Sequence, residues 1–232
     1  MKKIKLRGLV IRQEDAGESD KRLTLLCKGV GRVSVYARGA RRPKSKFIAT
    51  CQLFAYADFV VVQGRGFYSL AEATLISNFF DVADYERLQV ASAIVEICEK
   101  SLWDSENVDP ILLLALRSLD RMAKGRFSPL YTLAVFLLRF FVLYGLAPIM
   151  NRCVACETTD FTEGYFFSAE GLLCKAHENG NLRITKEAAI AAEQYLAMND
   201  TDNDPAVLHE LVKMGAVMLR THYEWKVMSL EV

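Results

Sequence analysis

The sequence predicts an α+β protein in which a five-stranded β-barrel precedes a helical domain that carries a small metal-binding module. Three observations support this class. Residues 3–76 contain five runs with strand patterning and no run of helical length. From about Asp81 onward, the apolar residues recur at the spacing of helices, and between residues 148 and 184 two short pairs of metal-binding residue types interrupt that spacing. Strands followed by helices are typical of α+β folds.

The strand runs share alternating or strongly apolar patterns and are separated by glycine-containing turns. They are Lys3–Val10, Arg22–Lys28, Arg32–Arg38, Cys51–Gln63 and Phe67–Leu75. Alternation with a period of two is the pattern of a half-buried strand. Five short strands without an intervening helix fit a small closed barrel, so the oligonucleotide-binding (OB) fold is predicted, with an SH3-like barrel as the alternative.

Five helices are expected after the barrel, and most begin at a capping residue or a proline. They cover Tyr85–Leu102, a helix that Asp109 caps and Gly125 ends, the apolar segment that Ser128 and Pro129 open, residues 186–198 with Thr185 as the cap, and a last helix that starts at Asp204 and Pro205 and runs to about Val227. The predicted division is an OB domain at 1–78, a helical domain at 79–147 and 183–232, and a zinc-binding module at 148–182.

The segment from Leu130 to Ala147 is almost wholly apolar and resembles a membrane span. Arg139 lies at its middle, where insertion into a bilayer costs ~2.5–3.5 kcal/mol. We therefore expect a buried helix at the centre of the helical domain. The basic start of the chain lacks the apolar region of a signal peptide, because Arg7 and Arg12 interrupt it.

The charge is distributed unevenly along the chain, although the formal net charge is only +1. Residues 1–50 hold 14 Lys/Arg against 4 Asp/Glu, residues 51–150 hold 8 against 11, and residues 151–232 hold 7 against 13. The net charges are therefore +10, −3 and −6. A basic N-terminal part on an otherwise mildly acidic chain indicates a module that faces a polyanion.

The basic character is greatest from Gly29 to Lys46, where a strand with polar residues on one face runs into a cationic loop. Cations neutralise phosphates and an aromatic ring offers a stacking platform to bases. The predicted DNA-binding residues are Arg32, Tyr36, Arg38, Arg41, Arg42, Lys44 and Lys46, supplemented by Lys3, Lys5 and Arg7. Two alternatives remain: a solvated charged face, and a scaffold whose basic loop binds an acidic protein tail without affinity for DNA.

A metal site is predicted at Cys153 and Cys156 together with Cys174 and His177. Two short chelating pairs separated by a 15–20-residue excursion are typical of tetrahedral zinc sites. With all four positions filled by protein, the zinc would be structural. The alternatives are isolated buried cysteines and a redox pair made by Cys153 and Cys156. The remaining cysteines lie in apolar runs and are expected in the core, and the cysteine usage as a whole fits a reducing cytosol.

No catalytic constellation stands out in the sequence. His209 and His222 lie in the last predicted helix, and no phosphate-binding loop of the GxxxxGK type occurs. The sequence therefore predicts a protein that is not an enzyme.

Several motifs occur in a characteristic order along the chain. Two are specific: Gly17-Glu18-Ser19-Asp20 with Leu23-Thr24-Leu25-Leu26, and Gly31-Arg32-Val33 with Ala37-Arg38-Gly39-Ala40-Arg41-Arg42-Pro43-Lys44-Ser45. Looser ones follow at Gly64-x-Gly66, Leu70-x-Glu72-Ala73, Leu138-Arg139-Phe140 and Tyr144-Gly145-Leu146-x-Pro148. Together they resemble the bacterial recombination mediator family RecO. The chain departs from that family at His177, where zinc-bearing members usually have cysteine, and at Glu157, where glycine often follows the first pair.

The resemblance implies an OB domain, a helical domain and an intervening zinc module. It also implies binding to single- and double-stranded DNA, annealing of complementary strands, a complex with RecR, contact with single-strand-binding protein, and help in loading the RecA recombinase. The expected place of action is cytoplasmic and nucleoid-associated.

Overall fold

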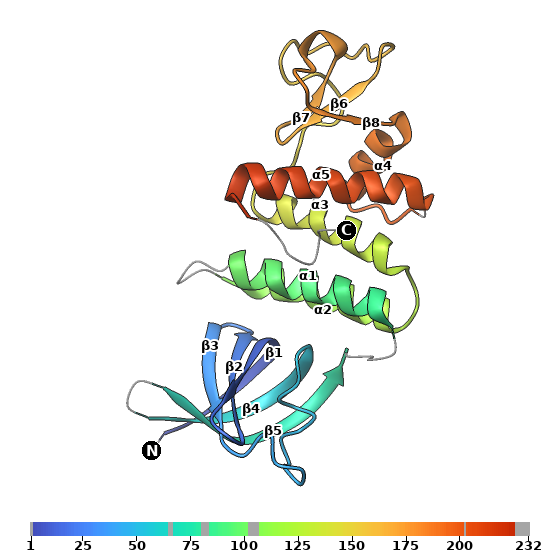
Figure 1. Ribbon diagram of the computed structural model, residues 1–232. Helices are drawn as coiled ribbons and strands as arrows, with labels where there is room; N and C mark the ends of the chain where they lie inside the picture. Colours follow the sequence, from blue (N-terminus) through green and yellow to red (C-terminus); the bar gives the residue numbers. More distant parts are fainter. Residues whose placement is uncertain (1, 65–66, 80–83, 102–106, 202, 226–232) are drawn as a thin grey trace. The chain divides into compact units, whose positions relative to one another are not determined.

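The computed structural model describes residues 2–64, 67–79, 84–101, 107–201 and 203–225 (Figure 1). The chain forms two compact units, Met1–Lys124 and Gly125–Val232. Each unit has its own buried apolar core. The first unit contains the barrel and the first two helices, and the division at residues 78, 147 and 182 remains a prediction.

Five strands of the first unit close into a barrel in the order β1-β2-β3-β5-β4. They are β1 (Lys3–Ala16), β2 (Asp20–Cys27), β3 (Gly31–Ala37), β4 (Ala55–Gln63) and β5 (Tyr68–Asn78). β1 pairs antiparallel with both β2 and β4, and β3 pairs with β5 in parallel. This closed five-stranded arrangement confirms the predicted OB fold.

The first strand extends six residues beyond the predicted run and closes the barrel. Its first half, Lys3–Leu9, pairs with β4, and its second half pairs with β2 up to Ala16. A bulge between Val10 and Arg12 separates the two halves, and a bulge bends a strand and re-aims its side chains. The alternation of polar and apolar residues therefore predicts the strand only as far as Val10, because the bulge interrupts its period of two.

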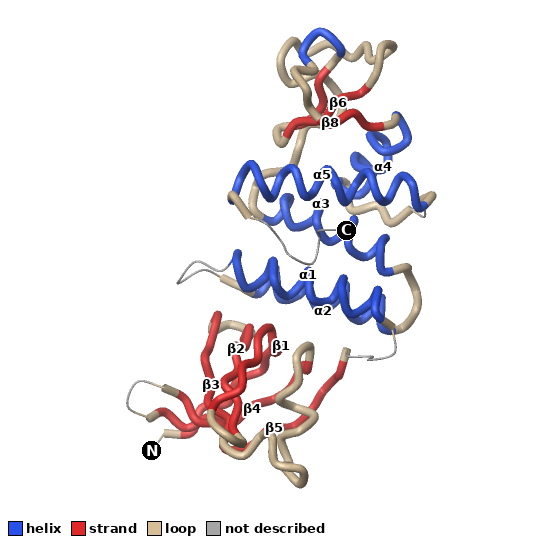
Figure 2. Tube along the Cα trace, in the orientation of Figure 1, coloured by secondary structure: helices blue, strands red, loops and turns tan. Residues whose placement is uncertain are grey.

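The barrel core is formed by the inward-pointing residues of all five strands. Leu6, Leu23, Val35 and Phe59 belong to one buried cluster. The segment between β3 and β4 consists of turns (Figure 2). It contributes Phe47 and Cys51 to the same cluster. The cationic loop is thus anchored to the barrel by apolar side chains that follow it.

Helices α1 (Tyr85–Ser101) and α2 (Asp109–Ala123) belong to the same compact unit as the barrel. Arg12 of β1 forms an ion pair with Glu99 of α1, with 3.0 Å between Nη1 and Oε1. The prediction that Asp109 caps α2 is wrong. Val108 is the capping residue, without a side-chain hydrogen bond. The Asp109 carboxylate instead accepts a hydrogen bond of 2.7 Å from the Gly29 N–H in the β2–β3 turn.

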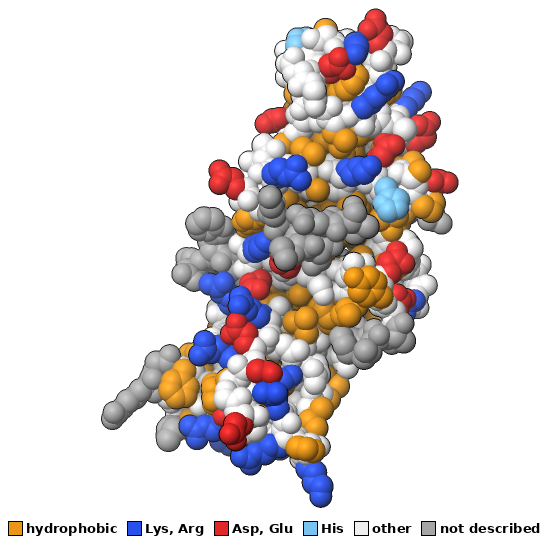
Figure 3. All heavy atoms as spheres, viewed as in Figure 1, with side chains coloured by type: hydrophobic (Ala, Val, Ile, Leu, Met, Phe, Trp, Pro, Cys, Tyr) orange, Lys and Arg blue, Asp and Glu red, His pale blue; other side chains and the backbone are white. Residues whose placement is uncertain are grey.

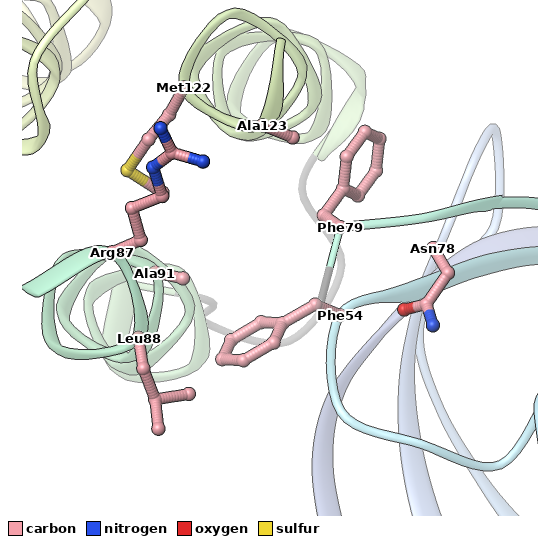
Figure 4. Close-up of a pocket in the computed structure, with 8 residues that line it drawn as sticks. All are labelled: Phe54, Asn78, Phe79, Arg87, Leu88, Ala91, Met122 and Ala123. Carbon is pink, nitrogen blue, oxygen red and sulfur yellow. The ribbon is translucent and has the colours of Figure 1, made fainter. Parts of the chain in front are cut away.

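A hollow of about 240 Å³ lies between the barrel and these helices (Figure 4). Phe54 and Phe79 line it from the barrel side, and Leu88, Ala91 and Met122 line it from the helices. Phe54 is fully buried and has a φ of 66°, a backbone conformation that a side chain of this size rarely adopts. Its ring is therefore held at the junction by the surrounding fold.

The second unit is built on α3 (Pro129–Leu143), α4 (Lys186–Leu196) and α5 (Pro205–Tyr223). The predicted N-caps are confirmed: Ser128, Thr185 and Asp204 each accept a hydrogen bond from a backbone N–H in the first turn. α3 and α5 approach closely at Gly215, where an added Cβ would lie 2.8 Å from Leu137 Cδ1. Only glycine leaves room for that approach.

The apolar segment around Arg139 is a buried helix of this unit, as predicted. Ten of the fifteen residues of α3 are buried. Arg139 forms an ion pair with Asp200, with 2.6 Å between Nη2 and Oδ1, and its side chain is only 12% exposed. Over the described residues, no helix has both the length and the apolarity that a membrane crossing requires.

Replacing Asp200 with alanine should destabilise the second unit by about 3–5 kcal/mol, since it leaves a buried guanidinium without its partner. The change Arg139→Leu should cost less, because Asp200 lies nearer the surface and the leucine continues an apolar helix. Urea unfolding followed by circular dichroism measures both free energies. A loss below 1 kcal/mol in D200A would show that the ion pair contributes little.

A three-stranded sheet in the order β7-β6-β8 lies between α3 and α4 in the chain. Its strands are β6 (Tyr165–Ser168), β7 (Gly171–Leu173) and β8 (Leu182–Ile184), with the short helix η1 (Lys175–His177) after β7. β6 and β7 pair antiparallel as a hairpin between the two chelating pairs. The third strand, β8, was not predicted, and it pairs with β6 up to Ile184.

Candidate nucleic-acid interface and metal centre

An open groove of about 630 Å³ lies on the outer face of β2 and β3. Its lining comes from β2, from β3 and the residue after it, and from the residue before β5. The lining residues are Asp20, Arg22, Ser34, Tyr36, Arg38 and Phe67. In OB folds, the face of the second and third strands and the adjoining loops bind oligonucleotides and oligosaccharides. We call this surface the β2–β3 groove.

The register of the sheet explains why these side chains meet. Arg22 lies directly opposite Tyr36 across the β2–β3 ladder, and Tyr36 lies beside Ser69 of β5. Ser34, Tyr36 and Arg38 recur at every second position and therefore share one face. Phe67, which is 51% exposed, comes from the other end of the barrel sequence and completes the groove.

The groove combines cations with aromatic rings. Arg22 and Arg38 are exposed, and among the described residues neither forms an ion pair. The Tyr36 ring lies close enough to both for their charges to lower the pKa of its phenol, although hydrogen bonding to Asp20 outweighs them and raises the pKa. Guanidinium groups beside exposed rings are the elements with which single-stranded nucleic acids are held.

The cationic loop after β3 is fixed to the turn between β1 and β2. Gly39, with a φ of 64°, donates its N–H to Asp20 Oδ1 at 2.7 Å. The Arg41 N–H donates to Ser19 O at 2.9 Å, and the Arg41 guanidinium forms an ion pair of 3.2 Å with Asp15. Lys46 Nζ donates to the carbonyl of Ala71 and lies 5.0 Å from the centroid of the Phe47 ring.

The predicted residues thus divide into groups. Tyr36 and Arg38 line the groove. Arg32 is exposed on the same face of β3, towards its start. The others follow in the loop, where Arg42 and Lys44 are exposed and Arg41 has a carboxylate partner; they are Arg41, Arg42, Lys44 and Lys46.

The three cations of β1 lie elsewhere on the barrel and are compensated by carboxylates. Lys3 forms an ion pair of 3.0 Å with Glu72, and Arg7 binds Asp58 through two hydrogen bonds of 2.7 and 2.8 Å. Lys5 lies near both carboxylates and helps to lower their pKa. Figure 3 shows Lys and Arg side chains over the barrel interspersed with carboxylates. This face therefore carries little uncompensated charge.

Sequence reasoning missed Arg22, Phe67 and Asp20 as groove residues. Arg22 was visible as the first residue of a predicted strand, but its partner across the ladder depends on the pairing register. Phe67 follows a glycine-rich turn, and nothing in the sequence indicates that this turn lies beside Tyr36. Asp20 carries the wrong charge for a phosphate-binding surface.

The four predicted metal ligands lie together in the second unit. The Sγ atoms of Cys153, Cys156 and Cys174 and a ring nitrogen of His177 all lie within 4.8 Å of one another. Cys156 Sγ is 3.8 Å from Cys174 Sγ. His177 Nδ1 is 3.3 Å from Cys174 Sγ and 3.9 Å from Cys153 Sγ. The predicted cluster is therefore formed.

These distances fit a tetrahedral metal ion. A zinc–sulfur bond of ~2.3 Å in tetrahedral geometry places two sulfur atoms ~3.8 Å apart. The hairpin of β6 and β7 carries the second pair, because Cys174 follows β7 directly and η1 turns His177 back toward it. The donor set of three sulfur atoms and one imidazole suits zinc and would hold one metal ion without an open coordination position.

The local backbone favours the thiolate form that a metal requires. Burial alone would raise the pKa of Cys153, but hydrogen bonds from the backbone of Cys174, Cys156 and Ala155 outweigh burial and lower the pKa to about 6. Glu157, directly after the first chelating pair, has a φ of 59°. This left-handed conformation is one that glycine adopts more readily than other residues.

Comparison with known proteins matches nearly the whole chain to one family. Residues 1–79 match the family model "Recombination protein O N terminal", and residues 82–231 match "Recombination protein O C terminal". A DNA repair protein RecO of Acetivibrio thermocellus is 34% identical over 97% of this chain and 93% of its own length. Those of Halalkalibacterium halodurans and Alkaliphilus metalliredigens are 32% and 33% identical over 74% of this chain, covering 67% and 70% of their lengths. With its OB barrel, its cysteine–histidine cluster and these matches, the chain belongs to the RecO family of DNA repair proteins.

Proposed function

We propose that this chain binds single- and double-stranded DNA without sequence specificity, and that the β2–β3 groove takes a single strand. The observation that carries the proposal is the groove itself, in which Arg22 and Arg38 flank the Tyr36 ring and Phe67 stands exposed beside them. Rings stack on every type of base and guanidinium groups contact every phosphate, so such a site is indifferent to sequence.

The cationic loop would extend this surface beyond the groove. Arg42 lies close enough to Asp20 of the groove for its charge to help lower the pKa of that carboxyl, and Lys44 and Lys46 are exposed further along the same loop. A second strand held there by its phosphates would lie near the first without electrostatic repulsion between the two. Annealing of complementary strands follows from this arrangement, because the cations screen the repulsion that otherwise keeps two strands apart.

The wider role is the one that the family resemblance implies. We propose that the protein acts in homologous recombination as a mediator that helps load RecA together with RecR and contacts single-strand-binding protein. The relatives named above are DNA repair proteins, which supports a role in repair. The metal at Cys153, Cys156, Cys174 and His177 is proposed to be a single structural zinc ion that holds the fold of residues 148–184.

Direct binding to single-stranded DNA tests the proposal. A filter-binding assay with a mixed-sequence oligonucleotide should show saturable binding at low salt that weakens steeply as salt increases, since released counterions drive such binding. A scaffold that uses its basic loop for an acidic protein tail would instead show negligible affinity for the oligonucleotide. That result would exclude the proposed function.

Replacing Arg41, Arg42 and Lys44 with alanine should weaken binding and make its salt dependence shallower. Three lost phosphate contacts reduce the slope of log K against log salt by ~2 on a single strand. Arg41 is already paired with Asp15, so the decrease in slope should correspond to the loss of between two and three phosphate contacts. The matched variant removes the same charge from the compensated face, as Lys3→Ala, Lys5→Ala and Arg7→Ala. If both variants lose the same amount of affinity for the oligonucleotide, the loop is not the site where DNA binds.

A further inference from the structure

One acidic residue lies in the groove, at the start of β2. Asp20 is half-buried, and both of its oxygens are used. Oδ2 accepts a hydrogen bond of 2.8 Å from the Tyr36 hydroxyl, and Oδ1 accepts one of 2.7 Å from the Gly39 N–H. Ser19 Oγ donates to Oδ1 as well, at 3.3 Å. A single carboxylate thus joins the aromatic ring of the groove to the first residue of the cationic loop.

We infer that Asp20 is a positioning residue that strengthens the binding of single-stranded DNA, despite its negative charge, by holding Tyr36 and the start of the loop in their binding geometry. This inference rests on the proposed function of the β2–β3 groove. Among the six lining residues Asp20 is the only acid. If its charge dominates, Asp20 repels phosphates and weakens DNA binding. If its positioning of Tyr36 and the loop dominates, it strengthens DNA binding.

The carboxylate remains charged under physiological conditions. The Gly39 N–H and the Tyr36 hydroxyl hold the pKa of Asp20 below its usual value, with smaller contributions from Ser19 and Arg42. An ionised carboxylate accepts stronger hydrogen bonds than a neutral group does. The Tyr36 hydroxyl is therefore committed to Asp20, and the ring is directed into the groove before DNA arrives.

Fixing the ring and the loop in advance lowers the cost of binding. A side chain or loop that must be ordered on association reduces affinity, whereas one already held in place does not. Other contacts also anchor the loop, including the hydrogen bond from the Arg41 N–H to Ser19 O and the ion pair between Arg41 and Asp15. Among the described residues, the hydrogen bonds of Asp20 join the Tyr36 side chain to the loop, so its loss should affect stacking more than folding.

Two substitutions of Asp20 separate position from charge, with an oligo(dT) strand as the probe. Asp20→Ala removes the carboxylate and should weaken binding about fivefold. Asp20→Asn loses the charge but keeps an oxygen for the Gly39 N–H, and it should bind as tightly as the parent protein or more tightly. Glu18→Ala is the control, because it removes a neighbouring exposed charge from the same turn. Tighter binding by D20A, or equal weakening in D20A and D20N, would overturn the inference.

A double-mutant cycle with Tyr36→Phe measures the coupling between the two side chains in oligo(dT) binding, which general destabilisation of the fold does not change. The phenylalanine keeps the ring and lacks the hydroxyl that Asp20 holds. The effect of D20A should therefore be smaller in the Y36F background than in the parent protein, because interacting residues are not additive. Additive losses would overturn the proposed link to Tyr36. A parent protein that fails to bind oligo(dT) would refute the proposed function itself, which this cycle presupposes.

Discussion

Replacing Tyr36 and Phe67 together with alanine should weaken the binding of single-stranded DNA by about 30-fold or more. Stacking of one base on an aromatic side chain contributes ~1–3 kcal/mol, and the groove presents two such rings. Because neither ring is charged, the slope of affinity against salt should stay unchanged. The loop variant that lacks Arg41, Arg42 and Lys44 should show the opposite signature, with a shallower slope.

Fluorescence anisotropy over a range of salt concentrations measures affinity and slope in the same experiment. Tyr85→Ala is the matched control, because Tyr85 is 73% exposed on α1 and lies outside the groove. Phe67→Ala alone should weaken binding too, and this single change removes only an exposed side chain, so it should not disturb folding. Unchanged affinity in both F67A and the double variant would show that bases do not stack in the β2–β3 groove.

Replacing Cys174 with serine should release the metal and unfold residues 148–184. Structural zinc contributes ~10–16 kcal/mol of apparent binding free energy in small domains. The apolar cluster around the site is small: Cys153, Phe166, Leu173 and Cys174, with Val154 and Phe161 packed against it. Such a cluster cannot replace the metal as a source of stability. Elemental analysis should find about one zinc ion per parent chain and almost none in C174S.

Hydrogen exchange locates the consequence of metal loss. Protection should disappear from β6, β7 and β8, while the barrel strands of the first unit keep theirs. His177→Cys is the informative control, since it retains four side chains that can bind zinc. A C174S protein with normal protection across residues 148–184 would show that the metal is dispensable for this part of the fold.

Much of the fold was predictable because local signals agree with tertiary structure. Ser128, Thr185 and Asp204 cap their helices as the sequence indicates. The five strands of the barrel were predicted correctly in number and order. The exceptions have physical causes. The second half of β1 was not predicted because the bulge after Val10 interrupts the alternation of the strand. Asp109 does not cap α2 because its carboxylate accepts a hydrogen bond from the β2–β3 turn. β8 is too short to show the alternating pattern of a strand.

The cysteine–histidine cluster was predictable from the sequence, and the groove only in part. Each chelating pair is local in sequence, so spacing alone indicates the site. The groove depends on register, which brings Arg22 opposite Tyr36, and on barrel closure, which brings Phe67 beside them. Charge compensation also depends on residues that are far apart in the sequence. Arg7 pairs with Asp58 because β1 lies beside β4, and Lys3 pairs with Glu72 because β4 in turn lies beside β5.

The location of the strand is tested most directly by photocrosslinking. A single-stranded oligonucleotide with evenly spaced 5-iododeoxyuridine would be irradiated in complex with the protein, and the crosslinked peptides identified by mass spectrometry. We predict crosslinks at Tyr36 and Phe67, the two aromatic residues that line the β2–β3 groove. Crosslinks confined to the second unit or to the compensated face around Lys3 and Arg7, with none at Tyr36 or Phe67, would contradict this assignment.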